Sequence, residues 1–493
     1  MGFRANYGRL SAIVIIFAAI LRFALASVSH ASGDSCWHLA AARFIAQNMQ
    51  IPLLQPFGSG REVFWAPPLF HIVAAGFYKL FYQFGAIWGP TLSDFSMKMV
   101  SPLFGSMTLI FVYLIAKKLF DRKIAFYSVL FMAFVPLHIY QSSISYVDSF
   151  TAFFVVASVY FLLQKRLIVS AVFFGLSLIA KQTALFTLPL MFYIVYRQYK
   201  GKVALKSAVF AGVTALVGCW WFIRNQVLLG NAFWPFFYKF FGGKIAPYAS
   251  ETGFNIFNIL HPLVYLQGYL EFFGVPLGSY AIISGFSIPF KPILLSGWLI
   301  ATMLFIAPLF IGIAVLKLKS PAKILYLWIL LNVAGVLIYV MSLDTFYSRF
   351  MLPAFPAFAM LWAVGFDRLL TSRIKKVAIL LFVAVAFVFV SAEFGKDVIA
   401  ARQWQSYSDD FSWIRANLEP DAFFYYGGQC LSYNINRLSD FSLDKPEAYI
   451  WINPNFALEP VAQINTTILK EFSNYTLSYN NPTTGTEVYL VKQ

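Results

Sequence analysis

Apolar runs close to the length needed to cross a membrane recur along this chain from residue 11 to residue 394. Short polar or charged segments separate them, and the composition becomes polar after about residue 394. The first run could be mistaken for a signal peptide, but it has no compelling small-residue cleavage pattern and further runs follow it. The pattern therefore predicts an all-α polytopic membrane protein.

The apolar runs predict about eleven transmembrane helices. These cover residues 10–28, 97–117, 124–140, 149–164, 167–181, 183–197, 204–223, 293–315, 323–341, 350–367 and 376–394. The fifth and sixth are short and meet near Lys181. We therefore expect them to pack as a pair that does not fully cross the membrane alone.

Two long loops on the same side separate these spans. The loop 29–96 contains amphipathic patterns over 35–48 and 68–84, which predict two helices beside the membrane. The loop 224–292 is rich in aromatic residues, Pro and Gly, and most of its rings fit a belt at the membrane–water interface.

The polar C-terminal segment predicts a small α/β domain. A helix is expected near 409–417, with strands at 423–426, 448–452 and 487–491 around an Asn-Pro-Thr-Thr-Gly turn. The predicted domains are therefore a transmembrane domain over 1–394 and a C-terminal domain over 395–493.

The excess of basic residues indicates topology rather than a nucleic-acid partner. The chain has 37 Lys and Arg against 21 Asp and Glu, which gives a net charge of +16. Six short segments between apolar runs contain 19 of the 37, within residues 4–9, 117–123, 165–166, 197–206, 317–323 and 368–376. Cytoplasmic loops are rich in Lys and Arg, so these segments and the N-terminus are predicted to be cytoplasmic and the C-terminal domain extracytoplasmic.

Acidic residues are scarce in the apolar part of the chain. Ten of the 21 acids precede residue 394. Eight of them fall on the predicted outer side or at outer helix ends: Asp34, Glu62, Asp94, Asp148, Glu251, Glu271, Asp344 and Glu393. None lies in the middle of a predicted span, where a proton- or ion-coupled transporter would be expected to carry ionisable groups. Any chemistry is therefore predicted to face outward.

Asp34 and Asp148 stand out among these acids by position. Asp34 begins the first outer helix, and Asp148 ends the short outer connection between the third and fourth spans. Each could instead cap the helix that follows it. Two acids without a third convergent ligand permit a divalent cation such as Mg²⁺ or Mn²⁺ without requiring one. The scattered Cys36, Cys219 and Cys430 predict neither a disulfide framework nor a metal cluster.

A series of short motifs follows the predicted spans and loops. In chain order they are Gly33-Asp34-Ser-Cys-Trp-His-Leu-Ala-Ala-Ala-Arg43, Pro67-Pro-Leu69, Lys117-Lys-Leu-Phe-Asp-Arg-Lys123, Asp148, Leu178-Ile-Ala-Lys181, Trp221-Phe-Ile-Arg224-Asn225 and Tyr347-Ser-Arg349-Phe-Met-Leu-Pro353. Over about residues 9–370 their order and spacing resemble the C-type glycosyltransferase superfamily. These membrane enzymes use polyprenyl-phosphate sugars and include protein O-mannosyltransferases, lipid A aminoarabinose transferases and oligosaccharyltransferase catalytic subunits.

Two departures limit the resemblance. O-mannosyltransferases often carry Asp-Glu in the first loop, whereas Ser35 follows Asp34 here. The Trp-Trp-Asp-Tyr-Gly motif of oligosaccharyltransferases is absent, because Trp220-Trp221 continues as Phe-Ile-Arg. Transfer of a whole oligosaccharide to Asn is therefore not expected, and the resemblance leaves the acceptor open among protein, glycan and lipid.

The resemblance implies transfer of a single sugar, with inversion, from a polyprenyl- or dolichyl-phosphate donor to an acceptor hydroxyl. Asp34 is predicted to be the general base, and Asp148 to position the acceptor or share that task. Arg349, Arg224 and Lys181 are predicted to bind the donor phosphate, since guanidinium groups suit bidentate phosphate contacts. Arginines at helix ends can also extend to the interface without a ligand.

Three other residues have weaker claims to the site. His38 could hydrogen-bond the base, although a packing or surface role is the simpler interpretation. Arg61 and Glu62 fit an ordinary solvated ion pair. Two other functions compete with the transferase: a flippase or transporter of lipid-linked sugars, and a non-catalytic sugar receptor that uses the C-terminal domain.

Overall fold

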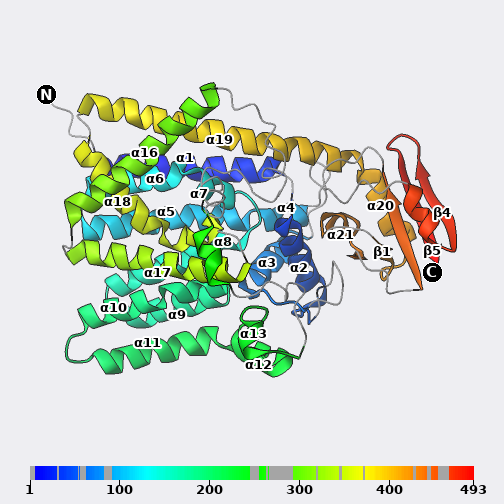
Figure 1. Ribbon diagram of the computed structural model, residues 1–493, viewed down its shortest axis with the longest axis horizontal. Helices are drawn as coiled ribbons and strands as arrows, with labels where there is room; N and C mark the ends of the chain where they lie inside the picture. The colour runs from blue at the N-terminus through cyan, green and yellow to red at the C-terminus, as the bar shows by residue number, and fades with distance from the viewer. Residues whose placement is uncertain are drawn as a thin grey trace. The chain divides into compact units, whose positions relative to one another are not determined.

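The computed structural model describes residues 6–29, 31, 33–53, 55, 63–82, 92–244, 255–261, 265, 292–317, 320–343, 347–369, 372–425, 429–440, 446–453 and 466–492 (Figure 1). Contacts divide the chain into two compact units. The first unit consists of Met1–Ala24, Ser101–Ser143 and Val147–Glu393. The second consists of Leu25–Val100, Ile144–Tyr146 and Phe394–Gln493.

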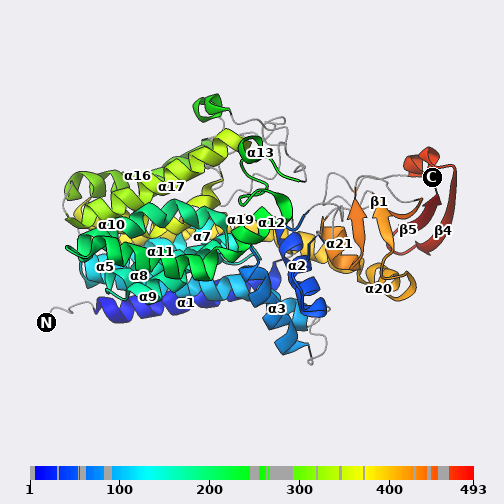
Figure 2. The same cartoon turned by 90° about the horizontal axis from the view of Figure 1, so that it is seen from below.

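The first unit is helical, and its long helices run side by side in both views (Figures 1 and 2). It contains, wholly or in large part, α1 (Tyr7–Val28), α5 (Val100–Leu119), α6 (Arg122–Phe134), α7 (Pro136–Gln141), α8 (Val147–Leu163), α9 (Leu167–Leu178), η1 (Gln182–Thr187), α10 (Leu188–Gln198), α11 (Val203–Gly218), α12 (Trp220–Leu229), α13 (Tyr238–Phe241), η2 (Ile256–Leu260), α16 (Pro292–Leu316), α17 (Ser320–Leu343), η3 (Ser348–Ala354), α18 (Phe355–Leu369) and α19 (Ser372–Ser406).

Helices α16 and α18 show how closely this bundle packs. A Cβ placed on Gly312 would overlap the Leu361 carbonyl oxygen, and one on Gly365 would overlap the Pro308 carbonyl oxygen. Small residues let two apolar helices approach until their backbones touch, as is common between membrane helices. A side chain at either glycine would force the two helices apart.

The predicted apolar runs all fall on helices, but the predicted number of about eleven spans is not confirmed. Within the described residues, four helices are long and apolar enough to cross a membrane: Tyr7–Val28, Leu92–Leu119, Ala322–Met341 and Ser348–Leu369. The pair Val203–Gly218 and Trp220–Leu229, bent by 57°, makes a fifth if it is one broken span. The predicted helix 183–197 begins as the 3₁₀ helix η1 rather than as an α-helix.

Pro136 interrupts the predicted span 124–140, and Arg22 hydrogen-bonds to the backbone at this interruption. Pro136 has no N–H, so it cannot donate to the carbonyl of Met132 four residues earlier. The fully buried guanidinium of Arg22 donates to the carbonyl oxygens of Met132 at 3.3 Å and Ala133 at 3.1 Å, and contacts His138 Nδ1 at 2.8 Å. Arg22 thus satisfies the end of α6 and attaches α1 to it.

The second unit combines short helices with a sheet. Its elements are α2 (Asp34–Asn48), α3 (Leu69–Phe81), α4 (Leu92–Lys98), α20 (Ser408–Asn417), β1 (Phe423–Tyr425), α21 (Gln429–Ile435), β2 (Leu438–Asp440), β3 (Glu447–Ile452), η4 (Thr466–Glu471), β4 (Asn474–Asn481) and β5 (Thr486–Lys492). The two amphipathic patterns of the first loop are α2 and α3, as predicted. The predicted C-terminal helix and three strands correspond to α20, β1, β3 and β5.

The sheet has five strands in the order β2-β1-β3-β5-β4. Strand β1 pairs in parallel with β2 and β3, and α21 connects β1 to β2. Strand β5 pairs antiparallel with β3 and β4. The predicted Asn-Pro-Thr-Thr-Gly turn joins β4 to β5, with Gly485 at φ +73°, a conformation that favours glycine.

Asp410 of α20 is fully buried and joins this helix to the β4–β5 hairpin. Its Oδ1 accepts hydrogen bonds from Tyr479 and Asn481, both at 2.7 Å. Its Oδ2 accepts from Thr484 at 2.8 Å and Thr486 at 2.7 Å. Burial, together with the bond to this carboxylate, raises the pKa of Tyr479 to about 12. Four neutral donors thus hold one buried charge.

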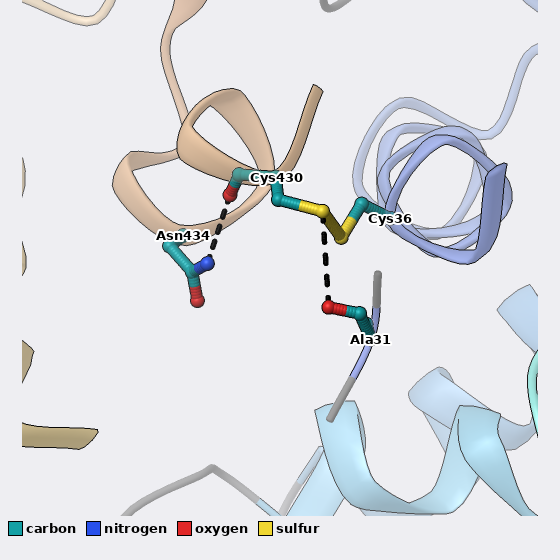
Figure 3. Close-up of a disulfide and its surroundings, with 4 residues drawn as sticks. All are labelled: Ala31, Cys36, Cys430 and Asn434. Atoms are coloured by element: carbon teal, nitrogen blue, oxygen red, sulfur yellow. Dashed lines mark hydrogen bonds between the residues drawn. A yellow bond between two sulfur atoms is a disulfide. The ribbon is translucent and has the colours of Figure 1, made fainter. Parts of the chain in front are cut away.

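Cys36 and Cys430 form a disulfide, so the prediction that the cysteines form none is wrong (Figure 3). Cys36 lies on α2 and Cys430 on α21, 394 residues apart in the chain. Asn434 Nδ2 donates to the Cys430 carbonyl oxygen at 2.8 Å, and the Cys430 sulfur lies 3.7 Å from the Ala31 carbonyl oxygen. No local spacing signals a pair so distant in sequence, because the fold alone brings the two helices together.

Candidate active site

Asp148 lies in the first turn of α8 and is paired with Lys181. The aspartate is 3% exposed, and Lys181 Nζ lies 2.6 Å from its Oδ1. A carboxylate buried this deeply requires a partner, since an isolated charge is expensive to remove from water. Both residues were predicted for the site, but in separate roles. Their pairing was not predicted.

The ring of Phe350 contacts both Lys181 of this pair and a second cation, Arg349. Lys181 Nζ lies 4.0 Å from the centroid of the Phe350 ring. The guanidinium of Arg349 lies 4.6 Å from the ring of Tyr347 and 5.7 Å from that of Phe350. All three distances are within the range of cation–π attraction. Lys181, which is paired with Asp148, and Arg349 therefore lie against the same aromatic side chain.

Short 3₁₀ turns between long helices create this arrangement. Lys181 precedes η1 in an extended conformation, and η3 contains Pro353, which interrupts regular α-helical bonding. The start of α8, η1 and η3 contact one another, and α17 packs against both turns. Tyr339 of α17 supports the ring of Phe350 at a centroid distance of 5.1 Å. The cations are thus carried by irregular turns held between packed helices.

Arg224, the other predicted phosphate ligand, makes contacts within its own helix. It lies on α12, where its guanidinium is 4.4 Å from the ring of Trp221. Its Nη1 donates to Asn225 Oδ1 at 2.9 Å, and Asn225 is fully buried. These contacts orient the side chain of Arg224 but do not include Phe350, Asp148 or Lys181 among those described.

Asp34 is the first residue of α2 in the second unit, and its side chain is exposed. Gly33 occupies the N-cap position with φ +50°, a region that favours glycine. Asp34 therefore lies one position inside the helix rather than at the cap. A carboxylate in the first turn is favoured by the helix dipole, so Asp34 has a structural contribution beside any chemical one.

His38 is buried on α2 and pairs with His71 of α3. His38 Nδ1 lies 2.9 Å from His71 Nε2, and Trp37 stacks on Phe64 with centroids 5.3 Å apart. Burial and the neighbouring His38 lower the pKa of His71 well below its usual value. The packing interpretation of His38 agrees with these contacts. His71 was missed, although it follows the Pro67-Pro-Leu69 motif by two residues.

Two further predictions concern Arg61 and Glu62 and a divalent metal ion. Arg61 and Glu62 lie outside the part of the chain that the structure describes. Within the described part, no group of three or more His, Cys, Asp or Glu side chains could hold a metal ion. The described partner of Asp148 is the ammonium of Lys181.

Comparison with known proteins adds a family match over part of the chain. A family model described as dolichyl-phosphate-mannose-protein mannosyltransferase matches residues 66–223. This segment includes Asp148 and Lys181 and ends one residue before Arg224. A comparison with curated proteins gave no match.

Solved structures match over nearly the whole chain. ArnT from Cupriavidus metallidurans bound to undecaprenyl phosphate is 12% identical, with a TM-score of 0.66 over 99% of this chain and 98% of ArnT. The apo state of the same protein gives 12% identity and a TM-score of 0.63, over 97% of each chain. The fold is that of the C-type glycosyltransferases. The resemblance predicted from the motifs is thus confirmed.

A third similar structure is that of an oligosaccharyltransferase. The archaeal oligosaccharyltransferase AglB from Archaeoglobus fulgidus, in complex with an inhibitory peptide and a dolichol-phosphate, is 13% identical with a TM-score of 0.52. The match covers 88% of this chain and 65% of AglB. At these identities the likeness concerns the fold, and the roles of individual residues have to be argued from their chemistry.

Proposed function

We propose that this protein is an integral membrane glycosyltransferase that transfers one sugar from a polyprenyl- or dolichyl-phosphate donor to an acceptor hydroxyl. The observation that carries the proposal is the match of fold over 99% of the chain to ArnT, whose structure contains undecaprenyl phosphate. The acceptor is a glycan, lipid or protein. The active site of the protein faces the outer side of the membrane, with the N-terminus cytoplasmic and the C-terminal domain extracytoplasmic.

The reaction is a single displacement at the anomeric carbon. The acceptor oxygen forms a bond to this carbon while the bond between the carbon and the phosphate oxygen breaks. The acceptor proton passes to the carboxylate of Asp34, which is the general base, and the polyprenyl phosphate leaves as an anion. One displacement on one face of the sugar inverts the configuration. Asp148 positions the acceptor or shares the proton transfer.

Cations are needed because the leaving group gains negative charge as the bond breaks. Lys181 and Arg349, which both lie against Phe350, are the groups proposed to stabilise it. The guanidinium of Arg349 can hold two phosphate oxygens at once, whereas Lys181 acts as a point charge beside Asp148. Arg224, already bonded to Asn225, is the third proposed phosphate contact.

The competing proposal is a flippase or transporter of lipid-linked sugars. A flippase moves the donor across the membrane without breaking the sugar–phosphate bond. Incubating purified protein in detergent with a polyprenyl-phosphate sugar and a candidate acceptor separates the two. Release of polyprenyl phosphate together with a glycosylated product supports the transferase, because no membrane sides exist in detergent. Translocation in vesicles without any product would favour the flippase.

Substitution of Asp34 tests the general base. Asp34→Asn keeps a polar group in the first turn of α2 but removes the proton acceptor. We expect the rate of transfer to fall roughly 10²–10⁴-fold while the melting temperature in detergent stays near that of the wild type. Asp34→Ala is not an adequate substitute, because it would lower both quantities whether the residue is catalytic or structural. Near-normal transfer by Asp34→Asn would contradict the assignment.

The proposed orientation can be tested with single cysteines. Only Cys219 need be replaced, because Cys36 and Cys430 are already joined. An impermeant maleimide should label an Ala416→Cys variant but not a Lys200→Cys variant in intact cells, since both positions are exposed and are predicted on opposite sides. Both should react after permeabilisation. The reverse pattern in intact cells would overturn the orientation.

A further inference from the structure

The second unit contains a cavity of about 700 Å³ that the proposed reaction does not use. Its walls come from the end of α1, from α2 to α4, from the end of α19, and from α20 and α21. Sites for small organic ligands usually measure about 300–1,000 Å³. The cavity is thus large enough for a molecule of the size of a short saccharide.

Basic side chains dominate the charged groups of this cavity. Those that line it are Arg43, Lys98, Arg402 and Arg415, against Asp94 among the described residues. Arg43 already neutralises this acid, since its Nη2 and Nε lie 2.7 Å and 3.1 Å from Asp94 Oδ1. Burial and the charge of Arg43 lower the pKa of Arg415. The cavity therefore has an excess of positive charge that an anion would offset.

Aromatic rings and amides line the rest of the cavity. Trp404 and Tyr433 line the cavity and are otherwise buried, the two residues being 5% and 8% exposed, so each adds part of an aromatic side chain to the wall. Gln47 and Asn434 add groups that both donate and accept hydrogen bonds. A sugar has apolar C–H faces that suit flat rings, and hydroxyl groups that suit amides. Rings, amides and cations together fit an acidic sugar better than a bare inorganic anion.

Two cross-links fix the walls of the cavity in advance. The Cys36–Cys430 disulfide joins α2 to α21 (Figure 3). On the same two helices, Arg43 Nη1 donates to the Tyr433 carbonyl oxygen at 2.8 Å, and its guanidinium lies 4.3 Å from the Tyr433 ring. Because these walls are tied together, a ligand need not order them, which lowers the cost of binding.

We propose that this cavity binds an anionic saccharide, in which a carboxylate or a phosphate group on the sugar contacts Arg402 and Arg415. The proposed binding does not depend on the proposed transferase function. Naming the saccharide as part of the acceptor rests on the proposed transferase function. An acceptor bound here through its acidic sugar would be selected by charge before any transfer takes place.

The test is isothermal titration of the purified full-length protein in detergent without any donor. The ligands are trigalacturonate, glucose 6-phosphate, neutral maltotriose and inorganic phosphate. We expect both acidic sugars, or one of them, to bind the wild type saturably and more tightly than maltotriose and phosphate. Comparing the two acidic sugars shows whether a carboxylate or a phosphate supplies the charge. Arg402→Gln and Arg415→Gln should each weaken binding about tenfold or more, the usual effect of losing a charged hydrogen bond.

The matched control is Arg197→Gln, an exposed arginine of α10 that contacts Tyr193 and should leave binding unchanged. Arg415 also donates to the Asn434 carbonyl oxygen, so its variant is checked by thermal melting, and the exposed Arg402 carries the test if that variant is unstable. The proposal is overturned if neither acidic sugar binds, if maltotriose or phosphate binds as tightly, or if Arg402→Gln has no effect. Since no transfer is measured, this result and the transferase assay can fail separately.

Discussion

Asp148 and Asp410 are both buried, but their surroundings differ in kind. Asp410 accepts four hydrogen bonds from neutral side chains, two at each carboxylate oxygen. The described partner of Asp148 is a charged ammonium at one oxygen. A carboxylate surrounded by neutral donors has a structural role, because each donor would lose its hydrogen-bond acceptor without it. An ion pair whose lysine lies against the same ring as a second cation, Arg349, can exchange partners when a charged group binds.

The largest expected contrast comes from the same substitution at both positions. Asp148→Asn should lower the rate of transfer by about 10²-fold or more, the lower end of the range for acid–base and positioning groups. Asp410→Asn should leave the rate per folded molecule within a few-fold. Both variants are assayed for transfer, with thermal melts run in parallel. Equal losses of activity in the two would end the distinction between a functional and a structural aspartate.

Asp410→Ala should have the largest effect on stability. It leaves four donors around an empty site, and each buried unsatisfied group costs about 1–3 kcal/mol. Some hydroxyl groups can rotate toward other acceptors, so we expect a loss of about 3 kcal/mol or more in the free energy of unfolding. Hydrogen exchange of β4 and β5 should accelerate together with it. Unchanged protection in this hairpin would show that Asp410 is not its main support.

Arg349 tests whether the region around Phe350 holds the donor phosphate. Arg349→Ala should weaken donor binding by roughly 2–3 kcal/mol, the value of a charge-assisted hydrogen bond. Arg349→Lys keeps the charge and should lose less, and Arg224→Ala should also lose less. Donor affinity is measured by displacement of a labelled polyprenyl phosphate. If Arg349→Ala binds donor as well as the wild type, this residue lies outside the site.

His71 extends the comparison to a buried group that is kept neutral. Its pKa is lowered by burial and by His38, so the unfolded chain binds a proton more readily than the folded protein. The stabilising effect is fully present above the ordinary histidine pKa of 6.5 and is lost as the pH falls below it. The slope should approach about 1.4 kcal/mol per pH unit. Chemical denaturation between pH 7.5 and pH 5.5, about one unit either side of that value, measures it. The slope should shrink in His71→Gln and persist in the exposed control His261→Gln.

These comparisons also show which parts of the molecule could be predicted from sequence. Helices α2 and α3 and strands β1, β3 and β5 were predicted, because each carries its own pattern of apolar residues and turn signals. The short β2 and the edge strand β4, which has mostly exposed side chains, carry little such pattern. The periodicity of apolar residues predicts each helix or strand from its own sequence, so elements without a clear pattern were missed.

Long-range pairs were the main omission in the candidate site. Asp148 and Lys181 were each placed at a helix end, but their contact depends on how α8 and η1 pack. The His38–His71 pair and the Cys36–Cys430 disulfide have the same origin, since each joins two helices whose relative position no local pattern specifies. In each case the residue types were visible, and their partners were not.

The buried Arg22 has a consequence for the biogenesis of this protein. A guanidinium within a newly inserted helix costs up to about 2.5–3.5 kcal/mol, the value at the helix centre, and the apolar residues of α1 must offset this cost. The carbonyl groups that bind it belong to Met132 and Ala133, which the ribosome adds 110 and 111 residues later. During synthesis, Arg22 can bind the Ala18 carbonyl oxygen of its own helix, but its contacts with α6 form only after α6 and the kink at Pro136 have been made. Insertion and folding are thereby coupled, because the hydrogen bonds that fix α1 to the bundle through Arg22 form when α6 and α7 pack against it.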